Sequence, residues 1–494
     1  MKKLPLFFAA LLCAVAAQAA PQPDLIARIH FAGVTKISAA GNSPAFTNEF
    51  CSAEAQALKT QTLDKLSVAL DGWLRQKTGA TVADGAAKLR PLLNDLQKSE
   101  WFLEASVAPD GKPEVALTVK LDDNRAQFWR ANLSAFFAPA TFRQSSGWLI
   151  FDCAEDGLKL GDGLAQKISV ADNNWLDVDL NWTRLAQIFP SLANCDFPET
   201  HLQVSARDGD FYLNGKFILS QPLSRPTQWR MPTNTIRQPL VSFTAVRGFA
   251  PWLEKKNLPY EISPVPDQVF VWALARIPFQ TFAAVPVPDA KNALAQIGRK
   301  MSTNKDWQRR FMAPFTMMMT NDQISWQGVP FIAPSLSAVH EASGDFLVAG
   351  LFPNAPRRNP LPPELFAQLA APNLVYYHWE ATAERLPELL QLSQLGLMLT
   401  RHQQLDGNSA AAKWLDKISP ALGSSVTTVT QTTPDELTFS RKAPGGLTAV
   451  EFYALANWLE AKNFPGCDLR LPLRPHLKNK RILVAAPSGV PSPH

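Results

Sequence analysis

The chain alternates between stretches with the two-residue spacing of β-strands and stretches with the three- and four-residue spacing of helices. Residues 240–245 have the strand pattern, and a short helical pattern around Trp252 follows them. The same order of strand and helix returns at Leu374 and, more faintly, at Trp175. We therefore expect a fold built from recurring strand-helix units.

Longer helices and tight turns accompany these units. Residues 54–75 place their leucines on one face of a helix, and residues 86–96 repeat the pattern. Asp208-Gly209 separates two alternating segments, which is typical of a β-hairpin. Thr448 and Glu451 have the spacing of a capping box, which predicts the start of a helix. Together these patterns favour an α+β fold in which antiparallel sheets carry helices packed on one face.

A proline-rich connection at 221–239 suggests where the chain divides. With 494 residues the chain is too long for one ordinary core, because domains average about 150 residues. We expect an N-terminal α+β domain over residues 20–226 and a C-terminal α+β domain over residues 236–486. Residues 487–494 are predicted to form a flexible tail.

The first 19 residues have the composition of a signal peptide. Lys2 and Lys3 precede an apolar run, and Ala17-Gln18-Ala19 supplies the small residues that a signal peptidase requires. Cleavage after Ala19 would release a periplasmic or secreted protein. We expect no membrane span after cleavage, because no later stretch offers the roughly 18 uninterrupted apolar residues that a span needs.

Four cysteines remain once this leader is removed: Cys51, Cys153, Cys195 and Cys467. An even number of separated cysteines in an exported chain favours disulfides. We expect a bond between Cys153, which ends an apparent strand, and Cys195, which follows a helix in the same predicted domain. The alternative is four buried free thiols.

The charge balance argues against one class of partner. The formal net charge is +5, which becomes 5 − 2 = +3 once Lys2 and Lys3 are removed. Nucleic-acid binding requires basic residues concentrated on one face, so we expect no nucleic-acid partner. Hydrophobic residues make up 46% of the chain and charged residues 18%, which predicts folded rather than disordered protein.

No catalytic signature stands out in the sequence. The H-E-x-x-H, P-loop and dinucleotide-binding motifs are absent. Asp177 and Asp179 project from the same face of a predicted strand, where paired carboxylates for acid-base chemistry would stand, but we interpret them as the solvated face of that strand. His378 has no cysteine or second histidine near it in sequence, and we interpret it as a packed or surface residue. We therefore predict no catalytic residues, no metal ligands and no cofactor.

Methionine is concentrated in one region. Five of the eight methionines fall between positions 301 and 319. Because methionine is flexible and polarizable, such a cluster can line an adaptable apolar surface. Candidate residues for an apolar ligand surface are Phe315, Met317, Met318 and Met319. The alternative is that these side chains form ordinary core.

Several stretches resemble a known family. HFAGVTKISA from His30, PLVSFTAVRGFAPWL from Pro239 and NLVYYHWEAT from Asn373 are similar to a family of uncharacterised exported proteins from bacteria of the Planctomycetes and Verrucomicrobia kind. FVWALARIPFQTFAAVPVPDA from Phe270 adds to this resemblance, which covers most of the mature chain. The resemblance implies export from a bacterium and assigns no functional residue.

These observations favour a non-catalytic envelope protein. We expect it to bind an envelope protein or an apolar ligand through its sheet faces or its methionine-rich region. One alternative is a secreted hydrolase whose residues converge only in three dimensions, in which case a cleft should hold a nucleophile, a base and oxyanion donors. A second alternative is a structural assembly subunit, which should expose unpaired sheet edges or large apolar patches.

Overall fold

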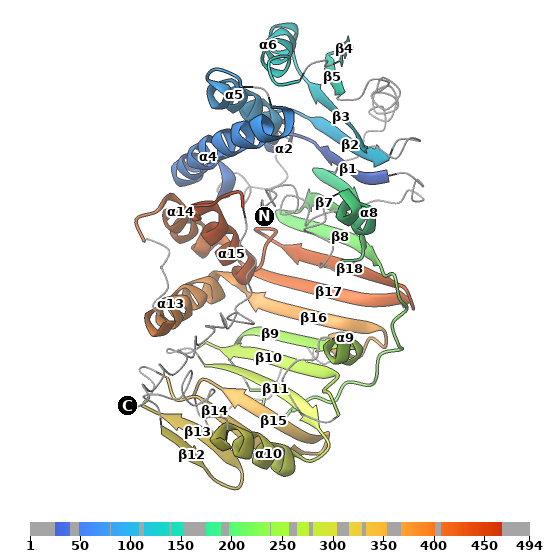
Figure 1. Cartoon of the computed structure of the whole chain (residues 1–494). Coiled ribbons are helices and arrows are strands. Elements are labelled where there is room, and N and C mark those ends of the chain that lie inside the picture. Colours follow the sequence, from blue (N-terminus) through green and yellow to red (C-terminus); the bar gives the residue numbers. More distant parts are fainter. Residues whose placement is uncertain are drawn as a thin grey trace, which may run out of the picture.

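The computed structural model of the chain describes residues 25–39, 49–79, 81–107, 113–137, 141–152, 174–188, 197–237, 239–255, 264–275, 280–303, 316–328, 332–352, 367–400 and 407–466. These residues form one large antiparallel sheet accompanied by helices (Figure 1). This mixture of helix and antiparallel strand agrees with the α+β prediction.

The first half of the chain supplies eight of the described strands. Its elements are β1 (Leu25–Phe31), α2 (Val34–Ala39), α4 (Ala53–Thr78), α5 (Gly85–Lys98), β2 (Trp101–Val107), β3 (Pro113–Lys120), α6 (Asp123–Leu133), β4 (Thr141–Ser145), β5 (Trp148–Asp152), β6 (Leu176–Leu180), α8 (Trp182–Ile188), β7 (Glu199–Arg207) and β8 (Asp210–Ile218).

The second half supplies ten more. Its elements are β9 (Leu240–Arg247), α9 (Ala250–Lys255), β10 (Gln268–Leu274), β11 (Thr281–Val287), α10 (Ala290–Thr303), β12 (Thr316–Met319), β13 (Gln323–Gln327), β14 (Ser335–Glu341), β15 (Gly344–Gly350), β16 (Leu374–Ala381), α13 (Thr382–Thr400), α14 (Ala410–Ile418), the 3₁₀ helix η3 (Ser419–Ala421), β17 (Ser424–Thr433), β18 (Glu436–Ala443) and α15 (Ala449–Glu460).

All strand pairs are antiparallel. The pairings place the strands in the order β4-β5-β3-β2-β1-β6-β7-β8-β18-β17-β16-β9-β10-β11-β15-β14-β13-β12. Figure 1 shows the same order from one end of the molecule to the other. Among the described strands, β4 and β12 therefore form the two outer edges of the sheet.

The last strands of the two halves pair with each other. In the pairing of β8 with β18, Asn214 lies opposite Ser440 and Gly215 lies opposite Phe439. A helical core also joins the halves, because Leu58 of α4 packs with Trp414 of α14 and Phe452 of α15. Sheet and core thus continue across the boundary expected between residues 226 and 236, and the division into two domains stays a prediction.

The three strand-to-helix segments seen in the sequence correspond to β6 with α8, β9 with α9, and β16 with α13. Each is followed along the chain by an antiparallel pair of strands, namely β7–β8, β10–β11 and β17–β18. Two local predictions are confirmed. The β7–β8 turn has φ of 54° at Asp208 and 87° at Gly209, and Thr448 with Glu451 forms a capping box at the start of α15.

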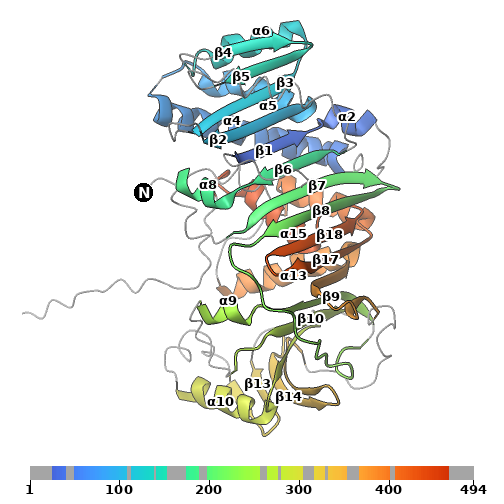
Figure 2. The ribbon, with the colours of Figure 1, turned by 90° about the vertical axis from the view of Figure 1, so that its right-hand side faces the viewer.

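Helices cover one face of the sheet. In the first half, Leu89 and Trp129 of α5 and α6 share a core with Ile29 and Val178. In the second half, Leu294 of α10 packs into a core with sheet residues. Figures 1 and 2 show α8, α9 and α10 on the side of the sheet that faces the viewer in Figure 1. We call this side the helix face.

The opposite face differs between the halves. Across β1, β6 and β7 it carries ionisable side chains, because Arg28, Asp179 and His201 lie side by side in the strand register. In the second half, a core that includes Phe243 and Trp272 packs against Met231 and Ile236 of the connecting segment. The connection between halves therefore serves as a cover for part of the sheet.

Candidate functional site: an apolar groove on the helix face

The methionine cluster lies at one edge of the sheet. Met317, Met318 and Met319 belong to β12, which pairs only with β13 among the described strands. Met318 and Met319 are 47% and 45% exposed, and the Met319 thioether lies against Gly298 of α10. Phe315 lies outside the described residues. The three methionines do not line the pocket found elsewhere on the sheet.

The cysteine prediction falls mostly outside the described part of the chain. Cys153, Cys195 and Cys467 all lie there. Within the described residues, Cys51 is a free and exposed thiol. The predicted bond between Cys153 and Cys195 stays a prediction.

The two aspartates of β6 are held in ion pairs on the face of the sheet opposite the helix face. Asp179 accepts from His201 Nδ1 at 2.9 Å and lies 3.9 Å from Arg28 Nη1. Asp177 lies 3.4 Å from His30 Nδ1. Val178 and Leu180 point into the core, as the amphipathic interpretation expects. Because each carboxylate already faces a cation or a histidine, this row is a charge network rather than a pair of free acids.

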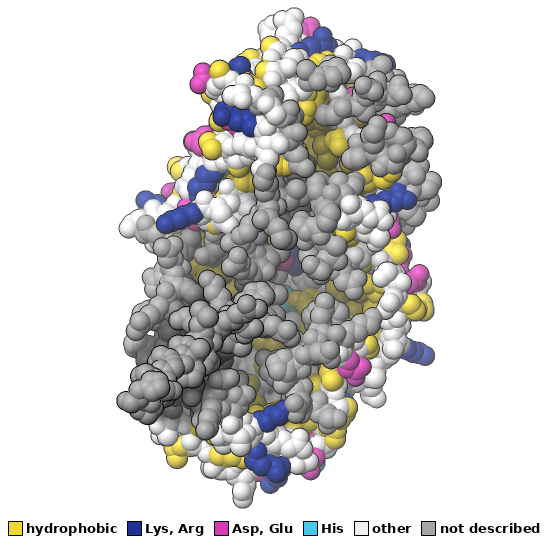
Figure 3. Space-filling model, viewed as in Figure 1, with side chains coloured by type: hydrophobic (Ala, Val, Ile, Leu, Met, Phe, Trp, Pro, Cys, Tyr) yellow, Lys and Arg dark blue, Asp and Glu magenta, His cyan; other side chains and the backbone are white. Residues whose placement is uncertain are grey.

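A groove of about 460 Å³ opens on the helix face over the strands that join the two halves. Its floor is a row of residues in register across four strands, running from β18 through β17 and β16 to β9. The row contains Phe439, Val429, Tyr376 and Val246, and Phe217 of β8 also lines the groove. In Figure 3, which views the same face, hydrophobic side chains gather in the hollow over β16 to β18.

The walls of the groove are also largely apolar. Phe217 and Phe439 meet edge to face with ring centroids 6.2 Å apart, on either side of the β8–β18 pairing. Leu437 and Val375 extend the apolar lining, and Leu223 and Pro226 of the connecting segment close one side. Such a lining favours a ligand that buries hydrocarbon surface.

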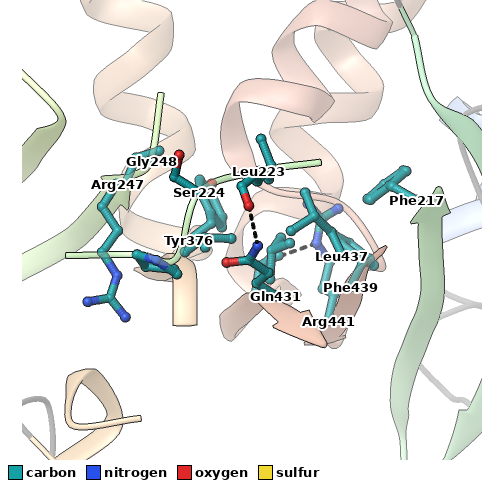
Figure 4. Close-up of a pocket in the computed structure, with 15 residues that line it drawn as sticks. Phe217, Leu223, Ser224, Arg247, Gly248, Tyr376, Gln431, Leu437, Phe439 and Arg441 are labelled. Carbon is teal, nitrogen blue, oxygen red and sulfur yellow. Dashed lines mark hydrogen bonds between the residues drawn. The ribbon is translucent and has the colours of Figure 1, made fainter. Parts of the chain in front are cut away.

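The connecting segment is fixed at this wall by two hydrogen bonds. The Leu223 N–H donates to Pro434 O at 2.6 Å, and Gln431 Nε2 donates to Leu223 O at 3.2 Å. Figure 4 shows the second bond, and it shows the Gln431 amide oxygen turned toward the side of the pocket where Tyr376 lies. The wall is therefore held through the backbone of Leu223, and only the amide nitrogen of Gln431 is used, which leaves its amide oxygen available.

The two arginines that line the groove are already satisfied. Arg441 makes a two-pronged ion pair with Glu451 at 2.7 and 2.9 Å and donates to Thr427 Oγ1 at 2.9 Å. Arg247 donates to the carbonyl oxygens of Leu374 and Pro372 at 2.7 and 2.6 Å. Figure 4 shows the Arg247 guanidinium turned away from the other lining residues. Neither cation is presented to a bound molecule.

Tyr376 is a polar lining residue without a partner in the described part of the chain. Its hydroxyl forms no hydrogen bond within the described part of the chain, although the residue lines the groove. Burial raises the pKa of Tyr376 to about 12, so the hydroxyl keeps its proton at every physiological pH. A half-buried phenol with an unused proton favours a ligand that carries a hydrogen-bond acceptor.

A second polar row lies next to the groove, two residues further along β16. The Thr244 hydroxyl is 2.8 Å from His378 Nδ1, and His378 Nε2 is 3.4 Å from Glu380 Oε2. Glu380 is 1% exposed and accepts from the Ala449 N–H at 2.6 Å. Burial opposes ionisation, but the imidazole and the bonds from Ala449 and Thr382 together lower the pKa of Glu380. Hydroxyl, imidazole and carboxylate thus follow one another, although His378 Nε2 is buried and makes no hydrogen bond to Glu380 or any other described residue.

His378 is a packed, half-buried side chain, which agrees with the sequence interpretation of a packed or surface residue. Its Nδ1 contacts the Thr244 hydroxyl, and Glu380 lies 3.4 Å from its Nε2. Sequence reasoning missed the partners because Thr244 and His378 meet only through the pairing of β9 with β16. The groove was missed for the same reason, since its lining combines strands from both halves of the chain.

Comparisons with known proteins add little to this geometry. No family model matches the chain, and no curated protein matches it at a significant level. One solved structure, described as "Structure of crystal form I of TP0453", is 9% identical with a TM-score of 0.22, and the match covers 47% of this chain and 100% of that one. Another, described as "Crystal structure of the di-domain ARO/CYC StfQ from the steffimycin biosynthetic pathway", is 11% identical with a TM-score of 0.07, covering 65% and 83%. Likenesses this weak carry no argument.

No group of three or more histidine, cysteine, aspartate or glutamate side chains among the described residues is arranged to hold a metal ion. No described helix combines the length and the apolar character needed to cross a membrane.

Proposed function

We propose that this protein is an exported binding protein that holds an apolar small molecule in the groove of the helix face. The observation that carries the proposal is the groove itself, a cavity of about 460 Å³ with phenylalanine, valine and leucine side chains on its floor and walls. Ligand sites in proteins commonly have volumes of roughly 300 to 1,000 Å³ and a mainly apolar lining.

The arrangement of charge supports binding rather than turnover. Both arginines that line the groove are engaged by protein oxygens, so the cavity offers hydrocarbon contact and a few polar groups. The signal-like sequence of residues 1–19 supports an exported protein that acts in the periplasm or outside the cell.

Filling the groove tests the proposal. Val429 lies on the groove floor, whereas Thr430, its neighbour on β17, points to the opposite face because successive strand residues alternate. We expect Val429→Trp to weaken binding of the neutral apolar dye N-phenyl-1-naphthylamine at least tenfold in a fluorescence titration. Thr430→Trp, the matched control, should bind like the natural chain.

The thermal midpoint of each variant shows whether it is folded before the dye is added. Equal dye affinity in both folded variants would exclude the groove as the binding site. Failure of the natural chain to bind the dye would exclude an apolar cavity that is open to solvent.

A second candidate function is suggested by the row of Thr244, His378 and Glu380. If this row activates water or the Thr244 hydroxyl, an ester bound in the neighbouring groove would be hydrolysed. Hydrolysis of p-nitrophenyl decanoate by the natural chain, lost in His378→Gln, would support a hydrolase. Release of nitrophenol at the background rate would leave binding as the function.

A further inference from the structure

Two polar groups of opposite character line the groove. Tyr376 supplies an O–H group without a partner in the described residues, and Gln431 supplies an amide oxygen whose amide nitrogen is already bonded to Leu223. Their strands are adjacent, since Tyr376 lies opposite Val429 and Gln431 follows two residues later on the same side of β17. The groove therefore offers a donor on β16 and an acceptor on the neighbouring strand β17.

The remaining lining excludes a charged headgroup. An anion would need a free cation, but Arg441 is paired with Glu451 and the Arg247 guanidinium points away from the pocket. A cation would need a free carboxylate, and no aspartate or glutamate lines the groove among the described residues. Burying an unpaired charge in such surroundings is strongly unfavourable.

We infer that the ligand is an uncharged amphiphile with a hydrocarbon body and a hydroxyl group that bonds Tyr376 and Gln431. A hydroxyl both accepts and donates, so it satisfies the phenol proton and the amide oxygen at once. The hydrocarbon body lies along Phe217, Val429 and Phe439. This inference rests on the proposed function and specifies the chemical class that the groove selects.

Isothermal titration calorimetry tests it with a series of ligands that are built on a linear ten-carbon chain. The natural chain should bind decan-1-ol about tenfold more tightly than decyl methyl ether, which keeps the acceptor but has lost the donor. Decanoate at pH 7.5 should bind more weakly than the alcohol, because its charge finds no free cation. Equal affinity for the alcohol and the ether, or tighter binding of decanoate, would overturn the assignment.

The Tyr376→Phe variant distinguishes a role of the hydroxyl in ligand binding from a role in the stability of the fold. Since the Tyr376 hydroxyl bonds no described residue, its removal should leave the thermal midpoint unchanged or slightly raised while decan-1-ol affinity falls about tenfold. Tyr212→Phe is the control, because Tyr212 lies on the opposite face of β8, where it stacks with Arg207. A Tyr376→Phe variant that binds decan-1-ol as tightly as the natural chain would overturn the role of the phenol.

Different results would contradict the proposed binding function and the assignment of the ligand headgroup. If no ligand of the series binds, or if Val429→Trp leaves the affinity for all of them intact, the groove is not a binding site and the proposed function is wrong. If the compounds bind in the groove without preference for the alcohol, the function stands and the assignment of the headgroup is wrong.

Discussion

Glu49 is a carboxylic acid enclosed in the helical core between the two halves of the chain. Its side chain is 0% exposed, and neither carboxyl oxygen has a hydrogen-bond partner among the residues that the structure describes. Oε2 lies beside Gly445, where an added Cβ would approach it to 3.1 Å. Burial raises the pKa of Glu49 from 4.5 to about 8, so the folded protein keeps this group protonated at neutral pH.

We predict that Glu49→Gln stabilises the protein at neutral and mildly alkaline pH. The unfolded chain ionises Glu49 above pH 4.5 while the folded chain retains the proton, so the natural residue lowers the free energy of unfolding as pH rises from 4.5 to about 8. The thermal midpoint of the variant should exceed that of the natural protein by several degrees at pH 8 and match it at pH 4. Glu384→Gln, a change at an exposed glutamate of α13, is the control. A rise in the thermal midpoint that does not depend on pH would contradict the raised pKa of Glu49.

The contribution of His201 to the stability of the fold changes with pH in the opposite sense to that of Glu49. The bond to Asp179 and the attraction of Asp179 and Glu199 raise the pKa of His201 despite its burial. Its contribution to stability is therefore complete below pH 6.5 and is lost as pH rises through the higher folded value. We predict that His201→Gln costs about 2 kcal/mol of unfolding free energy at pH 5.5 and little at pH 9, measured by urea denaturation. Equal losses at both pH values would show that the imidazole acts only by packing.

The start of α15 links helix capping to the groove. Thr448 caps the helix, and Glu451 both completes the capping box and neutralises Arg441 in the groove lining. The sequence predicts the capping box because its two residues are three positions apart. The ion pair with Arg441 could not be foreseen, since Arg441 reaches Glu451 only when β18 turns back into α15.

We predict that Glu451→Gln changes which ligand the groove prefers. The neutral amide leaves the Arg441 charge uncompensated at the edge of the pocket. Decanoate affinity should rise severalfold relative to decan-1-ol, with the ratio measured by calorimetry at low salt. Thr448→Ala serves as the control, because it should cost about 1 kcal/mol of stability without changing the ligand preference. If the ratio of decanoate affinity to decan-1-ol affinity is unchanged in Glu451→Gln, the charge of Arg441 does not determine which ligand the groove prefers.

The arrangement of the whole sheet explains which parts of the fold can be predicted from the sequence. Alternating patterns identify strands, and Asp-Gly turns identify neighbours within a hairpin, so local elements such as β7–β8 are predictable. The pairing of β8 with β18 joins segments more than 200 residues apart, and no local pattern specifies such a pair. The groove depends on two pairings between segments that are distant in sequence, β8 with β18 and β9 with β16. The conspicuous methionine run instead lies at the distant edge strand β12.

We predict that the two halves unfold together. Gly215 sits at the β8–β18 pairing, where an added Cβ would come within 2.2 Å of Leu202 and 2.3 Å of the His201 carbonyl oxygen. Gly215→Ala should lower the midpoint of a single calorimetric transition that includes both halves. Gly72→Ala in α4, where a Cβ meets nothing within 4 Å, should raise it, since alanine favours a helix by about 1 kcal/mol over glycine. Two separate transitions, with only one shifted by Gly215→Ala, would instead support two independent domains.

The groove on the helix face is tested most directly by native mass spectrometry of the mature protein purified from its own host. We predict a mass above that of the polypeptide, removed by solvent extraction and absent from the Val429→Trp variant but present in Thr430→Trp. The extracted compound should be uncharged, largely hydrocarbon and hydroxylated. A bare polypeptide mass from the natural chain, or the same bound mass in both variants, would contradict ligand binding in this groove.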